Sequence, residues 1–425
     1  MNDKFYGVWL YGRQIGVLGQ RGDFTWFRFT DAYLSDPDRS VLGLIFEEDL
    51  TAPHTGMLRL PEWFSNLLPE GILRRWIAEE RDVSPDREME LLAQVGHDLP
   101  GAVQVVAADL APDSLGDIPL PGKERSEETV DMAEPYWRFS LAGVGLKFSM
   151  VRTGDRLALP AFGEGGDWIV KLPDTEFKDV PRNENAMMTL ADHAGIEVPE
   201  HCLVHRSDLT MLPEGVWPES EEYAYAVRRF DRGENRSLIH IEDFAQVRNI
   251  YPYDDRKYQG NFETVAALAY RGQDLTALKE VARRIAFNVM ISNGDAHLKN
   301  WSLIYYDKRR PTLAPVYDLV STEFYRKAGY RENLGLRFGK SRRFDLVNLG
   351  TFARLERKLD VSAGSLTEVV QDTVNRTVAS WPGVSSLLDD NPALRDSIDR
   401  SITRRKASIL QRLPPLGTRS IRTSH

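Results

Sequence analysis

The chain has 425 residues, of which 28% are charged and 42% hydrophobic, and its formal net charge is −9 at neutral pH. This length exceeds what one compact core usually supports, so we expect two or three domains or lobes. The negative charge excludes a general nucleic-acid-binding protein. Cys202 is the only cysteine, which excludes an intrachain disulfide bond and a zinc site built on cysteines.

Three further features bound the class of protein. The N-terminus has no apolar signal-peptide core, and no apolar run approaches the roughly twenty residues of a membrane helix, so we expect a cytoplasmic protein without membrane contact. His201 and His205 share one face of an expected strand, but two histidines are insufficient for a metal site. The basic C-terminal residues indicate a solvated tail in preference to a nucleic-acid contact, and include Arg404, Arg405, Lys406, Arg412, Arg419 and Arg422.

The N-terminal part alternates apolar and polar residues. This pattern predicts short antiparallel strands at residues 6–10, 15–18, 24–29 and 41–46. Helical periodicity at 72–81 and 86–95 follows, and then a tight turn into another strand near residue 105. We therefore predict a β-rich subdomain over residues 1–108, followed by a linker over residues 109–136, which are rich in Pro, Gly, Asp and Glu.

Residues 138–150 predict two strands joined by a glycine-containing turn, the frame in which backbone N–H groups approach ATP phosphates in kinases. A plain hairpin is the alternative. Lys171 ends an apolar strand at 168–171, where kinases place a phosphate-neutralising lysine, although such a lysine also commonly solvates a sheet edge. Glu184 either lies in the first turn of the next helix or pairs with Lys171.

Residues 223–230 predict a strand that leads into a turn. A hinge between two lobes is expected there, with Arg229 and Phe230 beside an adenine ring. From residue 242 onward the pattern becomes mainly helical. Helices are expected at residues 242–250, 261–270, 275–291, 346–359, 365–379 and 391–413, and strands at 301–306 and 315–321.

The polar turn at residues 293–300 contains the candidate catalytic and metal-binding residues. Asp295 and Asn300 are five residues apart, the spacing of the base and the metal-binding amide in a kinase catalytic loop, and a hairpin would return Asp318 beside them. We assign Asp295 as the base, Asn300 and Asp318 to Mg²⁺, and Lys299 to the transferring phosphate. His297 holds the loop or touches a phosphate. Each residue alone more often serves a turn, but the joint pattern favours phosphoryl transfer.

The chain resembles the HipA-type serine/threonine kinases, the toxins of bacterial type II toxin–antitoxin pairs. The resemblance implies an α+β fold: a bilobal protein-kinase-like fold with an extra N-terminal β-rich subdomain and a mainly α-helical C-terminal lobe. It places the kinase N-lobe at 137–232, the C-lobe at 233–415 and a basic tail at 416–425. The matching segments occur in family order at residues 67–71, 99–103, 140–143, 183–184, 229–232, 242–244, 293–300 and 317–318.

The resemblance also implies ATP and Mg²⁺ as cofactors and assigns further residues. By resemblance, Ser140 is an autophosphorylation site, and its phosphate would place negative charge where ATP phosphates sit. The family usually has Gln at the position of Gly145 and often an acidic residue at Arg228, which puts loop closure and adenine contacts in doubt. The cofactor-binding residues are Ala142, Gly143, Val144, Gly145, Lys147, Lys171, Arg229, Phe230, His297 and Tyr317.

Two functions remain open from the sequence. The first is an ATP-dependent kinase that acts on a serine or threonine of a cytoplasmic protein. By resemblance the target is an aminoacyl-tRNA synthetase, translation is slowed, and a HipB-like helix-turn-helix antitoxin is the partner, with operator DNA reached only through the antitoxin complex. The alternative is a nucleotide-binding corepressor subunit that works through an antitoxin and operator DNA. Binding of ATP without transfer would favour the second.

Overall fold

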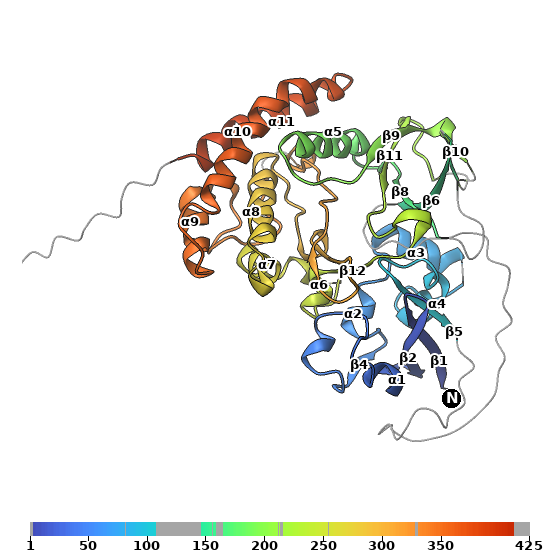
Figure 1. Cartoon of the computed structure of the whole chain (residues 1–425). Coiled ribbons are helices and arrows are strands. Elements are labelled where there is room, and N and C mark those ends of the chain that lie inside the picture. The colour runs from blue at the N-terminus through green and yellow to red at the C-terminus, as the bar shows by residue number, and fades with distance from the viewer. Residues whose placement is uncertain are drawn as a thin grey trace, which may run out of the picture. The chain divides into compact units, whose positions relative to one another are not determined.

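The computed structural model describes residues 3–80, 82–107, 146–154, 156–158, 165–210, 212, 216–253, 255–327 and 330–411. Several predicted features therefore lie outside the described residues: the loop from Ala142 to Gly145, Ser140, the linker at 109–136 and the basic tail at 416–425. The chain divides into two compact units, one made of residues 1–185, 199–259 and 297–317, the other of 186–198, 260–296 and 318–425. Helices and sheets are mixed along the chain, which confirms the α+β class (Figure 1).

The first unit begins with a five-stranded antiparallel sheet in the order β4-β3-β2-β1-β5. Its first three strands form a meander because tight turns separate them, and Tyr11 and Gly12 adopt left-handed backbone angles in the first turn. The last strand returns to pair with the first. The strands are β1 (Lys4–Leu10), β2 (Arg13–Arg21), β3 (Phe24–Phe29), β4 (His54–Met57) and β5 (Val103–Ala107).

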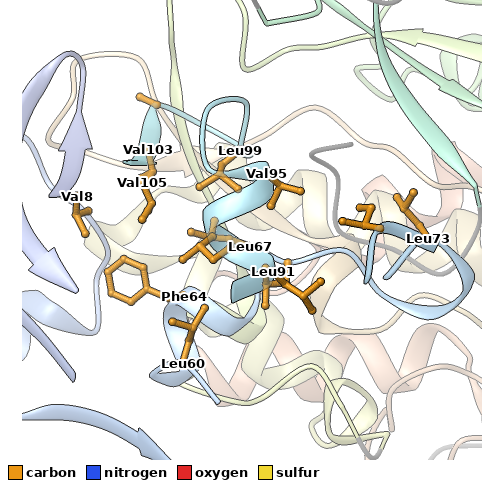
Figure 2. Packing of buried hydrophobic residues seen from close by; sticks show 14 of the residues in the cluster. Val8, Leu60, Phe64, Leu67, Leu73, Leu91, Val95, Leu99, Val103 and Val105 are labelled. Carbon is orange, nitrogen blue, oxygen red and sulfur yellow. The ribbon is translucent and has the colours of Figure 1, made fainter. Parts of the chain in front are cut away.

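Short helices contribute side chains to the same apolar core as this sheet. They are α1 (Asp31–Leu34), α2 (Glu62–Ser65), α3 (Gly71–Glu80) and α4 (Glu88–Val95). Figure 2 shows Val8 of β1, Phe64 of α2, Leu91 of α4 and Val105 of β5 converging in one core, where each is at most 1% exposed. Burying one such side chain stabilises the fold by about 1.5–3 kcal/mol. The same cluster continues through Phe148, Val170 and Ala226, so this subdomain shares its core with the strands that follow it in the chain.

The strand expected at residues 41–46 is wrong. Leu42 and Leu44 are buried as the pattern indicated, but the N–H of Leu44 donates to Oε1 of Glu242 at 3.0 Å in place of a neighbouring strand. A Cβ at Gly43 would lie 2.4 Å from Nε1 of Trp63, so this close backbone approach requires glycine. The segment then enters a 3₁₀ turn, η1 (Phe46–Glu48).

A six-stranded sheet in the order β10-β7-β6-β8-β11-β9 follows in the first unit. Phe148, Val170 and Ala226 alternate inward from three adjacent strands and are 0% exposed, which explains why these short runs form strands. The strands are β6 (Lys147–Thr153), β7 (Arg156–Ala158), β8 (Trp168–Lys171), β9 (His201–His205), β10 (Leu209–Thr210) and β11 (Tyr223–Arg228).

A three-stranded sheet, β12 (His240–Asp243), β13 (Ser302–Tyr305) and β14 (Thr312–Leu313), completes the first unit together with α6 (Phe244–Val247). The hairpin after residue 301 is therefore confirmed, but the strand expected at 315–321 is wrong, since pairing ends at Leu313. Pro315 has no N–H to donate, and Asp318 has φ 61°, a left-handed angle that no strand accepts.

The second unit is mainly helical. Helix α8 (Leu275–Met290) is its centre: Ile285, Phe287 and Met290 are 0% exposed, and α7, α10 and α11 pack around it (Figure 1). The predicted helices are confirmed in position as α7 (Phe262–Ala269), α9 (Leu349–Lys358), α10 (Thr367–Val384) and α11 (Pro392–Ile409). Helix α5 (Val180–His193) is shared by the two units. None of the described helices has the length and apolarity to cross a membrane.

Candidate functional site

A partly buried ion pair joins the six-stranded sheet to helix α5. Lys171 is the last residue of β8, and its Nζ lies 2.5 Å from Oε1 of Glu184, which is 3% exposed. Of the two roles open for Glu184, the structure shows the pairing. The first-turn position is wrong because α5 already begins at Val180. This pair reproduces the lysine–glutamate arrangement that protein kinases use beside ATP phosphates.

Lys147 lies in the same cross-strand row. The antiparallel register places Lys147 of β6 opposite Lys171 of β8, and Tyr225 of β11 on the other side of Lys171. Side chains directly opposite one another share a sheet face, and like charges there repel. Nζ of Lys171 also lies 5.7 Å from the Tyr225 ring centre. Two lysines opposite each other on one face of the sheet, one of them paired with a carboxylate of α5, make this face suitable for a polyanion such as a triphosphate.

The Arg229 side chain occupies a buried charge cluster. Its guanidinium donates to Asp98 at 2.7 Å and to both oxygens of Asp231 at 2.9 and 2.8 Å, while Arg232 contacts the same two carboxylates. Burial by itself would raise the pKa of Asp98, but the two guanidinium groups hold it well below its ordinary value. The Arg229 N–H donates to the carbonyl of Asp167. The guanidinium therefore stabilises the strand end after β11.

Phe230 and Tyr317, both predicted to contact the nucleotide, lie together. Their ring centres are 5.7 Å apart with planes inclined by 36°, and both side chains are half-buried. The Tyr317 hydroxyl lies 2.6 Å from the Ser302 hydroxyl and donates to the carbonyl of Lys299 at 2.7 Å. A pair of partly exposed rings is a surface on which a planar base can stack.

The polar turn at residues 293–300 belongs to the second unit up to Ala296. Side-chain hydrogen bonds hold the first residues of this turn in place. Nδ2 of Asn293 donates to Oδ1 of Asn288 at 2.7 Å, and Oδ1 of Asn293 accepts the Asp295 N–H at 2.9 Å. Asn293 is 1% exposed, so its amide serves the backbone of the turn. The sequence pattern gave no role to Asn293, although its Asn-Gly pair did predict a turn.

Gly294 allows a second segment to approach this turn closely. Its N–H donates to the Thr322 hydroxyl at 2.8 Å, and a Cβ there would lie 2.4 Å from Oε1 of Glu332. Glu332 is buried and receives two hydrogen bonds of 2.7 Å from Arg326. Any other residue at 294 would displace this ion pair. Contacts with Thr322 and Glu332 therefore hold the turn that contains Asp295.

Exposure separates the proposed reactive residues from their neighbours. Asp295 and Asn300 are half-buried, whereas the four residues between them are buried, and Asp318 is half-buried as well. Asp295 and Asp318 belong to the second unit, and Asn300 to the first, where it closes the 3₁₀ turn η7 (Leu298–Asn300). The left-handed backbone at Asp318 costs free energy of the order of 1–3 kcal/mol, and such strain clusters at functional sites.

His297, which precedes η7, and Lys299, which lies within it, are buried. The His297 ring meets Tyr258 edge-on at 5.0 Å, which suits a role in holding the loop. Nζ of Lys299 donates to the carbonyl oxygen of Asn66 at 2.9 Å and lies 3.0 Å from Oε1 of Glu70. Glu70 lies within a motif that carries the family resemblance, but its contact with Lys299 spans far too many residues for the sequence to reveal it.

Glu242 and His240 lie on β12, and their pKa values are shifted in opposite directions. Glu242 is 0% exposed and accepts hydrogen bonds from Leu44 N–H, from Trp63 Nε1 at 3.2 Å and from the Tyr305 hydroxyl. Burial raises its pKa to about 7 despite these donors. Burial likewise lowers the pKa of His240 to about 4, and its Nε2 lies 2.7 Å from the Leu42 carbonyl.

The donor set fits magnesium better than a transition metal. Among the described residues, no group of three or more His, Cys, Asp and Glu side chains is placed to hold a metal ion, and this includes the surroundings of Cys202. Mg²⁺ in phosphotransfer enzymes takes one or two protein oxygens and the rest from water and phosphate. In the first unit the amide of Asn300 offers an oxygen of that kind, and in the second unit the carboxylate of Asp318 offers another.

The chain has the mixed helix and sheet fold described above, and comparison with known proteins identifies its family. The model of the HipA N-terminal domain matches residues 6–106, and that of the HipA-like C-terminal domain matches residues 139–381. The chain therefore belongs to the HipA family, which confirms the resemblance inferred from its motifs.

Relatives and a solved structure agree with this assignment. Y4dM of Sinorhizobium fredii, provisionally named a kinase, is 39% identical over 92% of this chain and 95% of its own length. The serine/threonine-protein kinase toxin HipA of Shewanella oneidensis is 28% identical over 61% of this chain and 62% of its own. A solved complex of HipA, HipB and operator DNA from Shewanella oneidensis MR-1 has the same fold, with a TM-score of 0.71 at 20% identity over 95% of this chain and 97% of that chain.

Proposed function

We propose that this protein is an ATP- and Mg²⁺-dependent serine/threonine protein kinase that acts as a HipA-like toxin. The observation that supports this most strongly is the Lys171–Glu184 ion pair on β8 and α5, because a pairing of a strand lysine with a helix glutamate is what kinases require beside ATP. Family membership and the kinase names of its relatives support the same activity.

Each reactive residue then has one task. Asp295 accepts the proton of the attacking serine or threonine hydroxyl, and the oxygens of Asn300 and Asp318 hold Mg²⁺. Lys171 and Lys147 bind the phosphates, together with the loop from Ala142 to Gly145, which lies outside the described residues. When bound, ATP supplies the phosphoryl group that is transferred.

The remaining residues position the nucleotide and the loop. Phe230 and Tyr317 present their paired rings to adenine, and His297 keeps the loop in place through Tyr258. Arg229 acts through the strand end that it stabilises, since its guanidinium is already bonded to carboxylates. Ser140 is the autophosphorylation site, at which an added phosphate would oppose ATP binding.

The biological role follows from the family. The substrate is a protein of the cytoplasm, with an aminoacyl-tRNA synthetase as the first candidate, and its phosphorylation slows translation. The solved relative is a complex with HipB and operator DNA. We propose by analogy a HipB-like helix-turn-helix antitoxin as partner, with operator DNA contacted only through it.

Phosphoryl transfer from labelled ATP tests the activity. Purified wild type with Mg²⁺ and γ-labelled ATP is expected to label itself or an added protein, and Asp295→Asn is expected to lower the rate by about 10²–10⁴-fold, the usual contribution of a general base. Lys358→Met, an exposed change at the end of α9, is the matched control and is expected to leave the rate unchanged. A wild type that binds ATP but transfers none, while it tightens an antitoxin's grip on operator DNA, would instead support the corepressor function.

A further inference from the structure

Lys299 lies in the polar turn at residues 293–300, yet its ammonium group contacts residues of the N-terminal domain inside the first unit. It donates to the carbonyl of Asn66 at 2.9 Å and to Oδ1 of Asn66 at 3.3 Å, and it lies 3.0 Å from Oε1 of Glu70. Three oxygen atoms, two from Asn66 and one from Glu70, thus lie within 3.3 Å of this ammonium group. Its side chain is only 5% exposed, so the ammonium group faces these protein oxygens and not the solvent.

The charges around Lys299 are balanced. Oε2 of Glu70 lies 2.8 Å from Nζ of Lys257, and Oδ2 of Asp243 lies 3.7 Å from Nζ of Lys299. Burial by itself would raise the pKa of Glu70, but the two ammonium groups lower it to about 2, so this carboxylate stays ionised. Two lysines thus face two carboxylates, and the loss of one member would leave a buried charge without its partner.

The segment that receives Lys299 is part of the N-terminal core. Leu67 and Leu68 are 1% and 0% exposed, and Leu67 points into the same core as Phe64 in Figure 2. The side-chain amide of Asn66 also donates to the carbonyl of Ile250 at 2.8 Å. The acceptors of Lys299 are therefore carried by a well-packed part of the fold.

Lys299 is bonded directly to Asn300 in the chain, inside η7. Its carbonyl accepts the hydroxyl of Tyr317, so both its backbone and its side chain are held. Fixing this residue fixes the direction in which the next side chain leaves the backbone.

We propose that Lys299 is a positioning residue: its ammonium group anchors the turn that carries Asn300 to residues Asn66 and Glu70 of the N-terminal domain. This inference rests on the proposed kinase function for its enzymatic readout. It makes the N-terminal domain an integral part of the catalytic apparatus, and it replaces the direct phosphate contact expected for Lys299 from the sequence.

Kinetics of Lys299→Met, Glu70→Gln and their double variant test the proposal. Each single change is expected to lower kcat by about 10–100-fold and to raise the Mg²⁺ concentration needed, as loss of a residue supporting a metal ligand typically does, with KM for ATP little changed. The loss of rate in the double variant is expected to be smaller than the two single losses combined, because both changes remove the Lys299–Glu70 ion pair, while Glu70→Gln also removes the pair with Lys257 and Lys299→Met the bonds to Asn66. Lys299→Arg is expected to recover part of the rate, and Lys358→Met is the control.

Amide hydrogen exchange provides a readout that needs no activity. Glu70→Gln is expected to speed exchange at residues 298–301 while thermal unfolding shows a folded protein. A raised KM for ATP in Lys299→Met, with Glu70→Gln indistinguishable from wild type in rate and exchange, would overturn the proposal and restore a phosphate contact. If the wild type transfers no phosphate but the exchange result holds, the kinase function fails and the anchoring role stands.

Discussion

The buried carboxyl group of Glu242 gives a stability prediction that follows from one site. The side chain joins Leu44 and Trp63 of the N-terminal part to Tyr305 of β13. Its pKa is about 7 in the folded protein against 4.5 for an ordinary glutamate. Because the folded state holds this proton more tightly than the unfolded state, its contribution to stability is complete below pH 4.5 and is lost as pH rises through 7.

The magnitude follows from the shift. A shift of about 2.5 units corresponds to roughly 3 kcal/mol in total, of which roughly 2–3 kcal/mol is lost between pH 5 and pH 8. His240 acts in the opposite direction: its pKa is about 4 against an ordinary 6.5, so its contribution is lost as pH falls from 6.5 to 4. The wild-type profile alone therefore contains two opposing slopes.

Urea unfolding of wild type and Glu242→Gln between pH 5 and pH 8 separates the contribution of Glu242 from that of His240, because His240 is present in both proteins. The glutamine keeps an acceptor for Tyr305 and Leu44 but turns its amide toward Trp63, which costs about 1 kcal/mol at every pH. Relative to the variant, wild type is expected to lose roughly 2–3 kcal/mol across this range. A difference between the two proteins that does not change with pH would refute the reasoning.

Three further changes have defined outcomes. Lys171→Met is expected to weaken ATP binding at least tenfold by removing a phosphate cation, as measured by calorimetry, and unchanged affinity would contradict the assigned role. Phe64→Ala is expected to lower the free energy of unfolding by about 3–5 kcal/mol, whereas Tyr330→Ala, at a side chain 75% exposed, stays within about 0.5 kcal/mol. Arg229→Met leaves two buried carboxylates, Asp98 and Asp231, to the single guanidinium group of Arg232 and is expected to cost about 3–5 kcal/mol in urea unfolding; wild-type stability would show that the cluster is dispensable.

Local patterns predicted most elements because burial on one face sets the periodicity of each strand and helix. The errors have particular causes. Residues 41–46 carry a strand-like apolar pattern, but Glu242 supplies the hydrogen bond that a neighbouring strand would supply. Residues 315–321 follow a true strand, but Pro315 and the left-handed Asp318 end the pairing.

In the candidate site, too, local features could be predicted from the sequence and distant contacts could not. The spacing of Asp295 and Asn300 is a local feature, and both residues are half-buried while the four residues between them are buried. The partner of Glu184 was left open by its sequence position and became evident only from the ion pair with Lys171. The side chain of Lys299 contacts Asn66 and Glu70, and no sequence periodicity predicts a contact between residues so far apart in the chain.

The phosphoproteome of cells that express wild type, compared with cells that express Asp295→Asn, tests the central claim most directly. New phosphoserine or phosphothreonine sites on a small number of cytoplasmic proteins, present with wild type and absent with the variant, are the predicted result. Identical phosphoproteomes, with both proteins expressed and folded to the same level, would contradict the kinase function.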